Sequence, residues 1–406
     1  MNDAVKYYSL ISDKRRRIGN VSLLAGLFFI TTACFHFFSW YTVMAPYGTL
    51  ISAVFLIITL FCYVDLSYML KDPAFYLMAA GDMIALVNLF LIGSDKGAIL
   101  TVADLLLVLY LSNKVVLNDR EMAVSAFYTG IFFIYWTIDV KGYFKGYNTN
   151  YGGLVLISGF FFLIFFIEYI AGKAKDKRQY ICIRIFELIM VIVAFKIISW
   201  YRSRCALVGL ITFLFIYIMP KKIWKNKVIY AILCFLGTLG SVAFSAFYVW
   251  LGRMKEVFSF QIFYKDIISG RDELWGVLWD AYLKKPFTGI GSSYEINLEW
   301  LNGMFEVHSG LLDILMVHGL VVFIITMCFL LFRLFGIREM SGVDAVSKTA
   351  MAGIYGMLFT AFMENYVIVP PFLLMFLLLF TYINNRALSL SGQKEVSRDE
   401  GIEDTV

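Results

Sequence analysis

The chain is 406 residues long; 60% of its residues are hydrophobic, only 16% are charged, and the formal net charge is +5. An average soluble domain carries roughly 25% charged residues, and one of this length could not hide so much apolar surface. The composition therefore excludes a soluble enzyme, a disordered chain and a disulfide-stapled secreted module, and it leaves a polytopic membrane protein. The apolar runs are continuous rather than alternating, which argues against an outer-membrane barrel.

Apolar runs long enough to cross a bilayer recur along the chain. The first follows a basic cluster and is longer than the apolar core of a signal peptide, so we interpret it as the first span. Since a span needs about 20 apolar residues, the runs predict an all-α, polytopic transmembrane helical bundle of about 12 spans. They lie at about 19–38, 47–64, 74–93, 97–113, 122–138, 153–171, 180–199, 205–219, 228–250, 309–332, 349–364 and 367–383.

The distribution of Lys and Arg orients these spans. With a cytoplasmic amino terminus, the inner segments carry twice as many Lys and Arg residues as the outer segments. This excess is the positive-inside bias, and it predicts an even number of spans with both termini in the cytoplasm. We expect a single polytopic membrane domain over 1–383, followed by a flexible cytoplasmic tail over 384–406.

The long connection at about 251–308 faces outward in this topology, and chemistry often gathers in such loops. Within it, Ser269 is the predicted cap of a helix whose positive first turn contains Asp272 and Glu273. Apolar side chains recur at helical spacing and form one face of this helix: Leu274, Trp275, Leu278, Trp279 and Tyr282. We expect a short interfacial helix with its Trp and Tyr side chains at the bilayer surface.

Polar residues on the outer side are candidates for a functional site. His308 lies just before the tenth span, where a helix amino terminus favours a neutral imidazole that can act as a base. The alternative is an inert histidine that is hydrogen-bonded at the interface. Arg202 and Arg204 flank the outer connection between spans seven and eight. Their planar guanidinium groups are suited to binding phosphate, and the alternative is that they extend to lipid headgroups. Together these residues and the loop helix predict a site for an anionic, lipid-linked substrate.

Acidic residues in or near the spans favour a different class of function. Intramembrane carboxylates are functional candidates by default, and a proton-coupled carrier would use them. The acids are scattered, and Arg184 and Glu187 have the spacing of a local ion pair. The sparse prolines show no matching helix breaks in two halves. A carrier therefore stays as an alternative. The acids are Asp65, Asp82, Asp104, Glu168, Glu187, Asp313 and Glu364.

Three segments resemble motifs of the O-antigen polymerase and O-antigen ligase family. Tyr201–Leu210 is similar to its Ser-Arg motif, Ser269–Gly291 to its Arg…Trp…Pro…Gly-x-Gly segment, and Val307–Leu320 to its His-Asn…Gly-Leu segment. The order, the spacing and the outward orientation of the segments all agree with the family. Ser309 departs from the pattern because the family usually has Asn there, a change that leaves helix capping intact.

The resemblance implies a metal-independent, inverting glycosyltransferase at the outer face of the bacterial cytoplasmic (inner) membrane. Its donor would be a glycan linked to undecaprenyl diphosphate. His308 would be the catalytic base that takes the proton from the attacking sugar hydroxyl. Arg204 and Arg271 would clamp the diphosphate, supported by Arg202 and Arg253, because arginines must stabilise the leaving-group charge where no metal does so.

We expect a polysaccharide (O-antigen or capsular) polymerase, which transfers a growing glycan from undecaprenyl diphosphate to the next carrier-bound repeat unit. The alternatives are an O-antigen ligase, which uses lipid A-core as acceptor, and a lipid-linked oligosaccharide flippase or other transporter. A carrier should depend on Asp82 or Asp104 and tolerate changes at His308; a polymerase should show the opposite pattern. The expected partners are the lipid-linked donor and acceptor, membrane lipid and a chain-length regulator, with no cofactor, metal or nucleic acid.

Overall fold

The structure is a computed structural model. It describes residues 48–92, 96–115, 117, 119–143, 149–254, 261–262, 265–266, 270–298, 301–304, 307–338 and 344–399. The predicted span at about 19–38 lies outside these residues. Helices make up most of the described chain, and each predicted span from residue 47 onward coincides with a helix or a pair of helices. The predicted all-α class is therefore confirmed.

The described elements fall into a helical bundle and a long loop. The helices are α4 (Gly48–Tyr63), α5 (Leu66–Met69), α6 (Pro73–Ile92), α7 (Lys96–Leu111), α8 (Asp119–Tyr143), α9 (Thr149–Ala171), α10 (Lys177–Tyr201), α11 (Arg204–Ile218), α12 (Lys221–Lys225), α13 (Lys227–Thr238), α14 (Gly240–Gly252), α15 (Arg271–Tyr282), α16 (Gly310–Gly336), α17 (Ala345–Thr360) and α18 (Pro370–Asp399). The loop also contains two antiparallel hairpins, β1 (Gln261–Ile262) with β2 (Lys265–Asp266), and β3 (Glu295–Leu298) with β4 (Leu301–Met304).

Several helices have the length and composition of membrane spans. In the described part of the chain, 3 helical segments are both long enough and apolar enough to cross a membrane: α6, Gly152–Ala171 within α9, and α16. The predicted span at 228–250 is divided into α13 and α14, which are bent by 59° and would count as a fourth span. Shorter apolar helices include α4 and α11. These helices support a multi-pass membrane protein, and the total of twelve spans stays a prediction.

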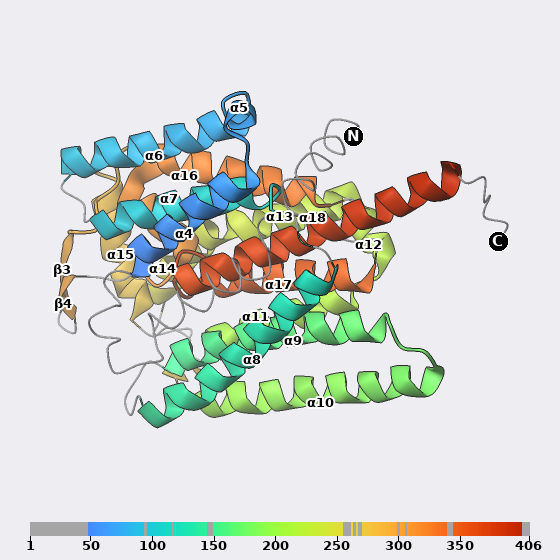
Figure 1. Ribbon diagram of the computed structural model, residues 1–406. Coiled ribbons are helices and arrows are strands. Elements are labelled where there is room, and N and C mark those ends of the chain that lie inside the picture. Colours follow the sequence, from blue (N-terminus) through green and yellow to red (C-terminus); the bar gives the residue numbers. More distant parts are fainter. Residues whose placement is uncertain are drawn as a thin grey trace.

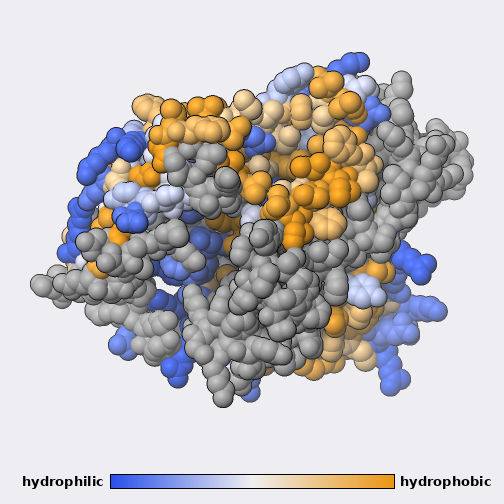
Figure 2. Space-filling view, turned by 60° about the vertical axis from the view of Figure 1, so that its left-hand side comes forward, coloured by the Kyte–Doolittle hydropathy of each residue, from blue (hydrophilic) through white to orange (hydrophobic). Residues whose placement is uncertain are grey.

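The outer surface of the bundle is apolar. Phe90 is 79% exposed and Ile218 is 72% exposed, and many other large apolar side chains also point outward. Figure 2 shows hydrophobic side chains gathered over the upper and middle part of one face, with hydrophilic ones toward its edges. Soluble proteins rarely expose patches of this size. A bilayer is therefore the natural surroundings of these helices.

The interior of the bundle is built around α17, which is buried along most of its length and packs against α9, α11 and α18. On one side of it α16 packs against α6, α7 and α13, and on the other α8 and α10 pack against α9 (Figure 1). Figure 1 also shows α15 and the β3–β4 hairpin at the left-hand end of the bundle, with α12 and the end of α18 toward the opposite end. The helix and hairpin of the long loop therefore cover one end of the bundle.

The carboxyl-terminal helix is longer than the sequence predicts. α18 continues to Asp399, through most of the segment predicted as a flexible tail, and residues 400–406 lie outside the described chain. The exit of α18 from the bundle is fixed by side-chain amides. Asn384 donates to the carbonyl oxygen of Ser112 at 2.8 Å, and Asn385 accepts from the N–H of Leu117 at 2.8 Å.

The helix in the long loop is packed more deeply than expected. Trp275 is fully buried, with its ring against those of Phe244 and Tyr248 on α14. Its indole N–H donates to the carbonyl oxygen of Val307 at 2.7 Å. The prediction that Trp275 lies at the bilayer surface is therefore wrong, because the apolar face of α15 is buried against protein. The predicted cap, Ser269, lies outside the described residues, and Gly270 occupies the cap position.

A break in α16 binds the part of the loop that follows α15. Gly319 interrupts the helix with φ 84° and ψ 175°. Carbonyl groups next to such a break can accept hydrogen bonds from outside the helix. The N–H of Ile290 donates to the carbonyl oxygen of Met316 at 2.8 Å, and the N–H of Gly291 donates to that of Val317 at 3.2 Å.

The two chain segments approach too closely for side chains at this point. The N–H of Leu320 donates to the carbonyl oxygen of Pro286 at 2.8 Å. A Cβ on Gly319 would lie 2.3 Å from the backbone oxygen of Phe287, and a Cβ on Gly289 would lie 2.4 Å from a backbone oxygen of α16. The Pro…Gly-x-Gly and Gly-Leu segments therefore dock the loop onto the bundle.

Candidate functional site

One buried carboxylate joins residues from separate parts of the chain. Glu364 lies between α17 and α18 and is 6% exposed. Its Oε1 accepts from the Arg271 guanidinium, in the first turn of α15, at 2.5 Å and from the Asn150 side-chain amide, in the first turn of α9, at 2.8 Å. Its Oε2 lies 3.5 Å from Nδ1 of His308, just before α16. Glu364 thus holds together the amino termini of three helices.

The segment that carries Glu364 is fixed on the first turn of α16. The N–H of Gly310 donates to the carbonyl oxygens of Ala361 at 3.0 Å and Glu364 at 3.2 Å. The Ser309 hydroxyl donates to the carbonyl oxygen of Ala361 at 3.1 Å. N–H groups in a first helical turn have no partner within the helix, so they are available for such contacts. Ser309 occupies the cap position as expected, but its hydroxyl holds the Glu364 segment instead of capping the helix.

A fourth helix amino terminus lies beside the same carboxylate. Ser203 caps α11 through its side-chain oxygen, and its hydroxyl also lies 3.5 Å from the backbone oxygen of Asn150. Cys205, in the first turn of α11, lies within electrostatic range of Glu364. Arg204 is the first residue of α11 and is only 9% exposed. Four positive helix ends therefore surround this point, and each favours an anion.

The surroundings of Glu364 favour its charged form. Burial by itself raises the pKa of Glu364, but the contact with His308, the positive charge of Arg271 and the hydrogen bond from Asn150 together lower that pKa below its ordinary value. The partial positive charges of the nearby helix ends act in the same direction. Glu364 is therefore a carboxylate at neutral pH, despite its burial.

His308 is placed so that one ring nitrogen faces Glu364. Its backbone has a left-handed conformation with φ 53°, which is uncommon for a residue other than glycine and requires support from its surroundings. A carboxylate at Nδ1 orients the imidazole and stabilises the imidazolium that forms when the ring takes up a proton. The geometry can therefore support general-base chemistry at His308.

The predicted arginines occupy two different settings. Arg271 contacts Glu364 directly, and Arg204 is buried at the start of the neighbouring α11. Arg202 follows α10 in a left-handed conformation with φ 53° and is exposed, and Arg253 follows α14 and is also exposed. The structure therefore brings Arg271 to the buried site with Arg204 nearby, while Arg202 and Arg253 lie outside it.

Two residues of this constellation were not predicted as site residues. The sequence identifies Glu364 only as one of several scattered acids, and it gives no reason to single out Asn150. The available signal was topological, because both residues lie at connections on the same predicted side of the membrane as the long loop. The hydrogen bond between them joins residues 214 positions apart in the sequence, and a local sequence pattern cannot predict a contact between such distant positions.

Two other acids belong to a separate cluster. Arg184 contacts Glu187, as the spacing predicts, and it also contacts Glu168, each at 2.5 Å. The Tyr217 hydroxyl donates to both carboxylates. This cluster joins α9, α10 and α11 at their ends far from Glu364. These acids are accounted for by local pairing, so they add no support to a carrier.

The fold and the site define a multi-pass membrane protein with a buried polar site, rich in helix amino termini, beneath the loop at one end of the bundle. Residues 188–327 of the chain match the model of a family described as O-antigen ligase. The match covers less than half of the chain; it includes Arg204, Arg271 and His308 and leaves Asn150 and Glu364 outside. The chain matches no curated protein and no solved structure.

Proposed function

We propose that the protein is a polysaccharide polymerase of the O-antigen or capsular type. It transfers a growing glycan from undecaprenyl diphosphate to the non-reducing end of the next undecaprenyl-diphosphate-linked repeat unit. The observation that carries the proposal is the meeting of His308, Arg271 and Glu364 beside four helix amino termini. The family match supports a membrane enzyme of the O-antigen ligase or polymerase type.

In this reaction His308 takes the proton from the attacking hydroxyl of the acceptor sugar. The hydroxyl oxygen forms a bond to the anomeric carbon of the donor as the bond between that carbon and the diphosphate oxygen breaks. Attack from the face opposite the diphosphate inverts the anomeric centre. Glu364 holds the imidazole and stabilises its protonated form, so it acts as a positioning residue for His308.

The diphosphate develops negative charge as it leaves, and the proposed site offers several preorganised donors for it. Arg204 is the first residue of α11, where the helix dipole also favours an anion, and its guanidinium is one of these donors. Arg271 has five N–H donors in total, so it can bind Glu364 and a phosphate oxygen together. The exposed Arg202 and Arg253 raise the positive potential at the entrance, which favours the approach of the anionic donor.

The expected topology puts this site on the outer face of the bacterial cytoplasmic membrane with both termini inside. The support is the distribution of basic residues together with the position of α15 and the β3–β4 hairpin at one end of the bundle. α12, which carries Lys221, Lys222 and Lys225, lies toward the other end, as a cytoplasmic segment would.

The Arg271→Lys variant should reduce kcat/KM for glycan transfer by about 10²–10³-fold, the usual effect of removing one preorganised donor. Lysine keeps the positive charge but loses the planar fork that serves Glu364 and the substrate at once. Initial rates with a purified lipid-linked repeat unit provide the measurement. Arg253→Lys is the matched control, and it should change kcat/KM by less than about threefold. Equal losses in the two variants would contradict the assignment of Arg271.

The direct test is a reaction of the purified protein with synthetic undecaprenyl-diphosphate repeat units in the presence of EDTA. A product ladder that rises by one repeat at a time, and that His308→Ala abolishes, would support a metal-independent polymerase. Transfer only to added lipid A-core would overturn the proposal in favour of the ligase. Loss of function in Asp82→Asn or Asp104→Asn, with full function in His308→Ala, would overturn it in favour of a carrier.

A further inference from the structure

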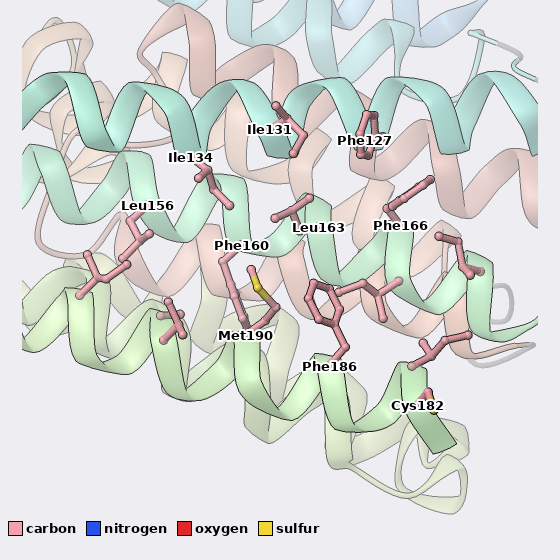
Figure 3. Close-up of a pocket in the computed structure, with 16 residues that line it drawn as sticks. Phe127, Ile131, Ile134, Leu156, Phe160, Leu163, Phe166, Cys182, Phe186 and Met190 are labelled. Carbon is pink, nitrogen blue, oxygen red and sulfur yellow. The ribbon is translucent and has the colours of Figure 1, made fainter. Parts of the chain in front are cut away.

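An apolar groove lies between α10 and the pair formed by α8 and α9. Its volume is about 690 Å³, and within the described chain its lining is entirely apolar. Figure 3 shows side chains from all three helices pointing into the groove. They include Phe127 and Ile131 from α8, Leu156 and Phe160 from α9, and Phe186 and Met190 from α10.

This groove is suited to a hydrocarbon chain. Ordered water needs polar partners, and the lining provides none. α10 carries large apolar side chains on its other face too, with Ile189 50% exposed and Ile192 51% exposed. That face contacts lipid in a membrane-embedded bundle, so the groove lies directly behind a lipid-facing helix. Its lining on α9 extends from Leu156 to Ile170, about 21 Å at 1.5 Å per residue.

The two ends of the groove have different neighbours. Cys182 and Ile183 line one end; the nearby ion pairs of Arg184 with Glu168 and Glu187 lie outside the lining, on the side of α9 and α10 that faces Tyr217 of α11. At the other end, Leu156 is six residues from Asn150 of the proposed site, about 9 Å along α9.

The same end of the groove also leads toward the arginines. Ile197 lines it on α10 and stands five residues before Arg202. Tyr201 packs over Gly152 here, where a Cβ would lie 2.6 Å from its ring. A chain leaving the groove therefore passes Tyr201 and meets Arg202 and then Arg204.

We propose that this groove binds the apolar polyprenyl tail of the lipid-linked substrate, whose diphosphate extends past Arg202 to Arg204 and Arg271. The inference rests on the proposed function, because it takes a lipid diphosphate as the substrate. An acyl chain of a bulk phospholipid has the same apolar chemistry as the tail. Charge complementarity favours the substrate: two arginines and a helix amino terminus at the polar end match a diphosphate better than a headgroup with one phosphate.

The first test is photolabelling of the full-length protein in detergent micelles. The probe is an undecaprenyl-diphosphate-linked repeat unit with a diazirine in its tail. Mass analysis should find the label on the lining of α8, α9 and α10. Excess undecaprenyl diphosphate should suppress that labelling at least fivefold, and excess phosphatidylglycerol should not. Label outside the groove, or equal suppression by both lipids, would overturn the proposal.

A substitution pair gives an independent test. Met190→Trp fills the groove and should raise KM for the long-tailed donor by about tenfold or more, with no change for a donor whose tail has two isoprene units. Ile192→Trp adds the same ring on the lipid-facing side of α10 and should change neither KM. Equal effects of Met190→Trp on both donors would contradict the inference.

The two experiments separate this inference from the proposed function, because labelling needs no turnover. Labelling of the groove without any transfer would overturn the proposed function, whereas transfer with the label elsewhere would overturn only this inference.

Discussion

The Glu364→Gln variant should lower the rate of glycan transfer by about 10²–10⁴-fold, the range expected when a general base loses its support. The amide has nearly the same shape and can still accept from Arg271 and Asn150, but it cannot stabilise the imidazolium that forms at His308. Single-turnover rates with the lipid-linked donor measure the chemical step directly. Glu273→Gln, an exposed acid on α15, is the control and should keep the wild-type rate. A rate for Glu364→Gln within about threefold of wild type would exclude this role.

The same variant has an expected signature in the dependence of stability on pH. The pKa of Glu364 in the folded protein lies below its ordinary value of 4.5, even though burial opposes this. The carboxylate therefore contributes stability that is present above pH 4.5 and is lost as the pH falls through the lowered pKa. The difference in Tm between wild type and Glu364→Gln should be largest near neutral pH and should shrink in acid. A difference that does not change with pH would show that the charge of Glu364 is not what stabilises the fold.

The Gly319→Ala variant should have the largest effect on stability, a loss of more than about 4 kcal/mol. Its φ of 84° with ψ of 175° is a conformation that residues with a Cβ adopt only at high cost, and the new Cβ would meet a backbone oxygen at 2.3 Å. Backbone cannot move aside as a flexible side chain could. Thermal unfolding in detergent, followed by size-exclusion chromatography, provides the measurement.

Gly336→Ala is the matched control for this prediction. Gly336 ends the same helix, and a Cβ there would meet nothing within 4 Å. Its effect should be below about 1 kcal/mol, the difference in helix propensity between the two residues. Similar losses in both variants would show that the docking of the loop on the break in α16 does not determine stability.

Hydropathy predicted where the helices are, and it could not predict how they are bent or paired. The run at 228–250 is apolar throughout, so nothing in its composition indicates the 59° bend between α13 and α14. The sequence correctly predicted that α15 has an apolar face, but such a face can be buried either by lipid or by protein. Only the packing of Trp275 under Val307 distinguishes the two.

The sequence predicted the arginines and the histidine of the candidate site, but it did not predict the carboxylate and the amide that contact them. Arg204, Arg271 and His308 stand in segments that resemble known motifs, whereas Glu364 and Asn150 stand in segments without such a resemblance. Acids in or near the predicted spans are frequent enough in this chain that the presence of Glu364 among them did not indicate a site. The position of Glu364 follows from the hydrogen bonds that the N–H of Gly310 donates to the segment carrying it, which are tertiary contacts.

In the proposed reaction, the carboxylate of Glu364 would also affect the release of the product. The undecaprenyl diphosphate left by the proposed transfer would carry more negative charge than the donor, and the arginines alone would retain it. A fixed negative charge beside Arg271 at 2.5 Å would offset part of that attraction, so we expect product release to be faster than from a purely cationic site. Undecaprenyl diphosphate should therefore inhibit Glu364→Gln at lower concentrations than it inhibits the wild type, which competition assays of donor binding can measure.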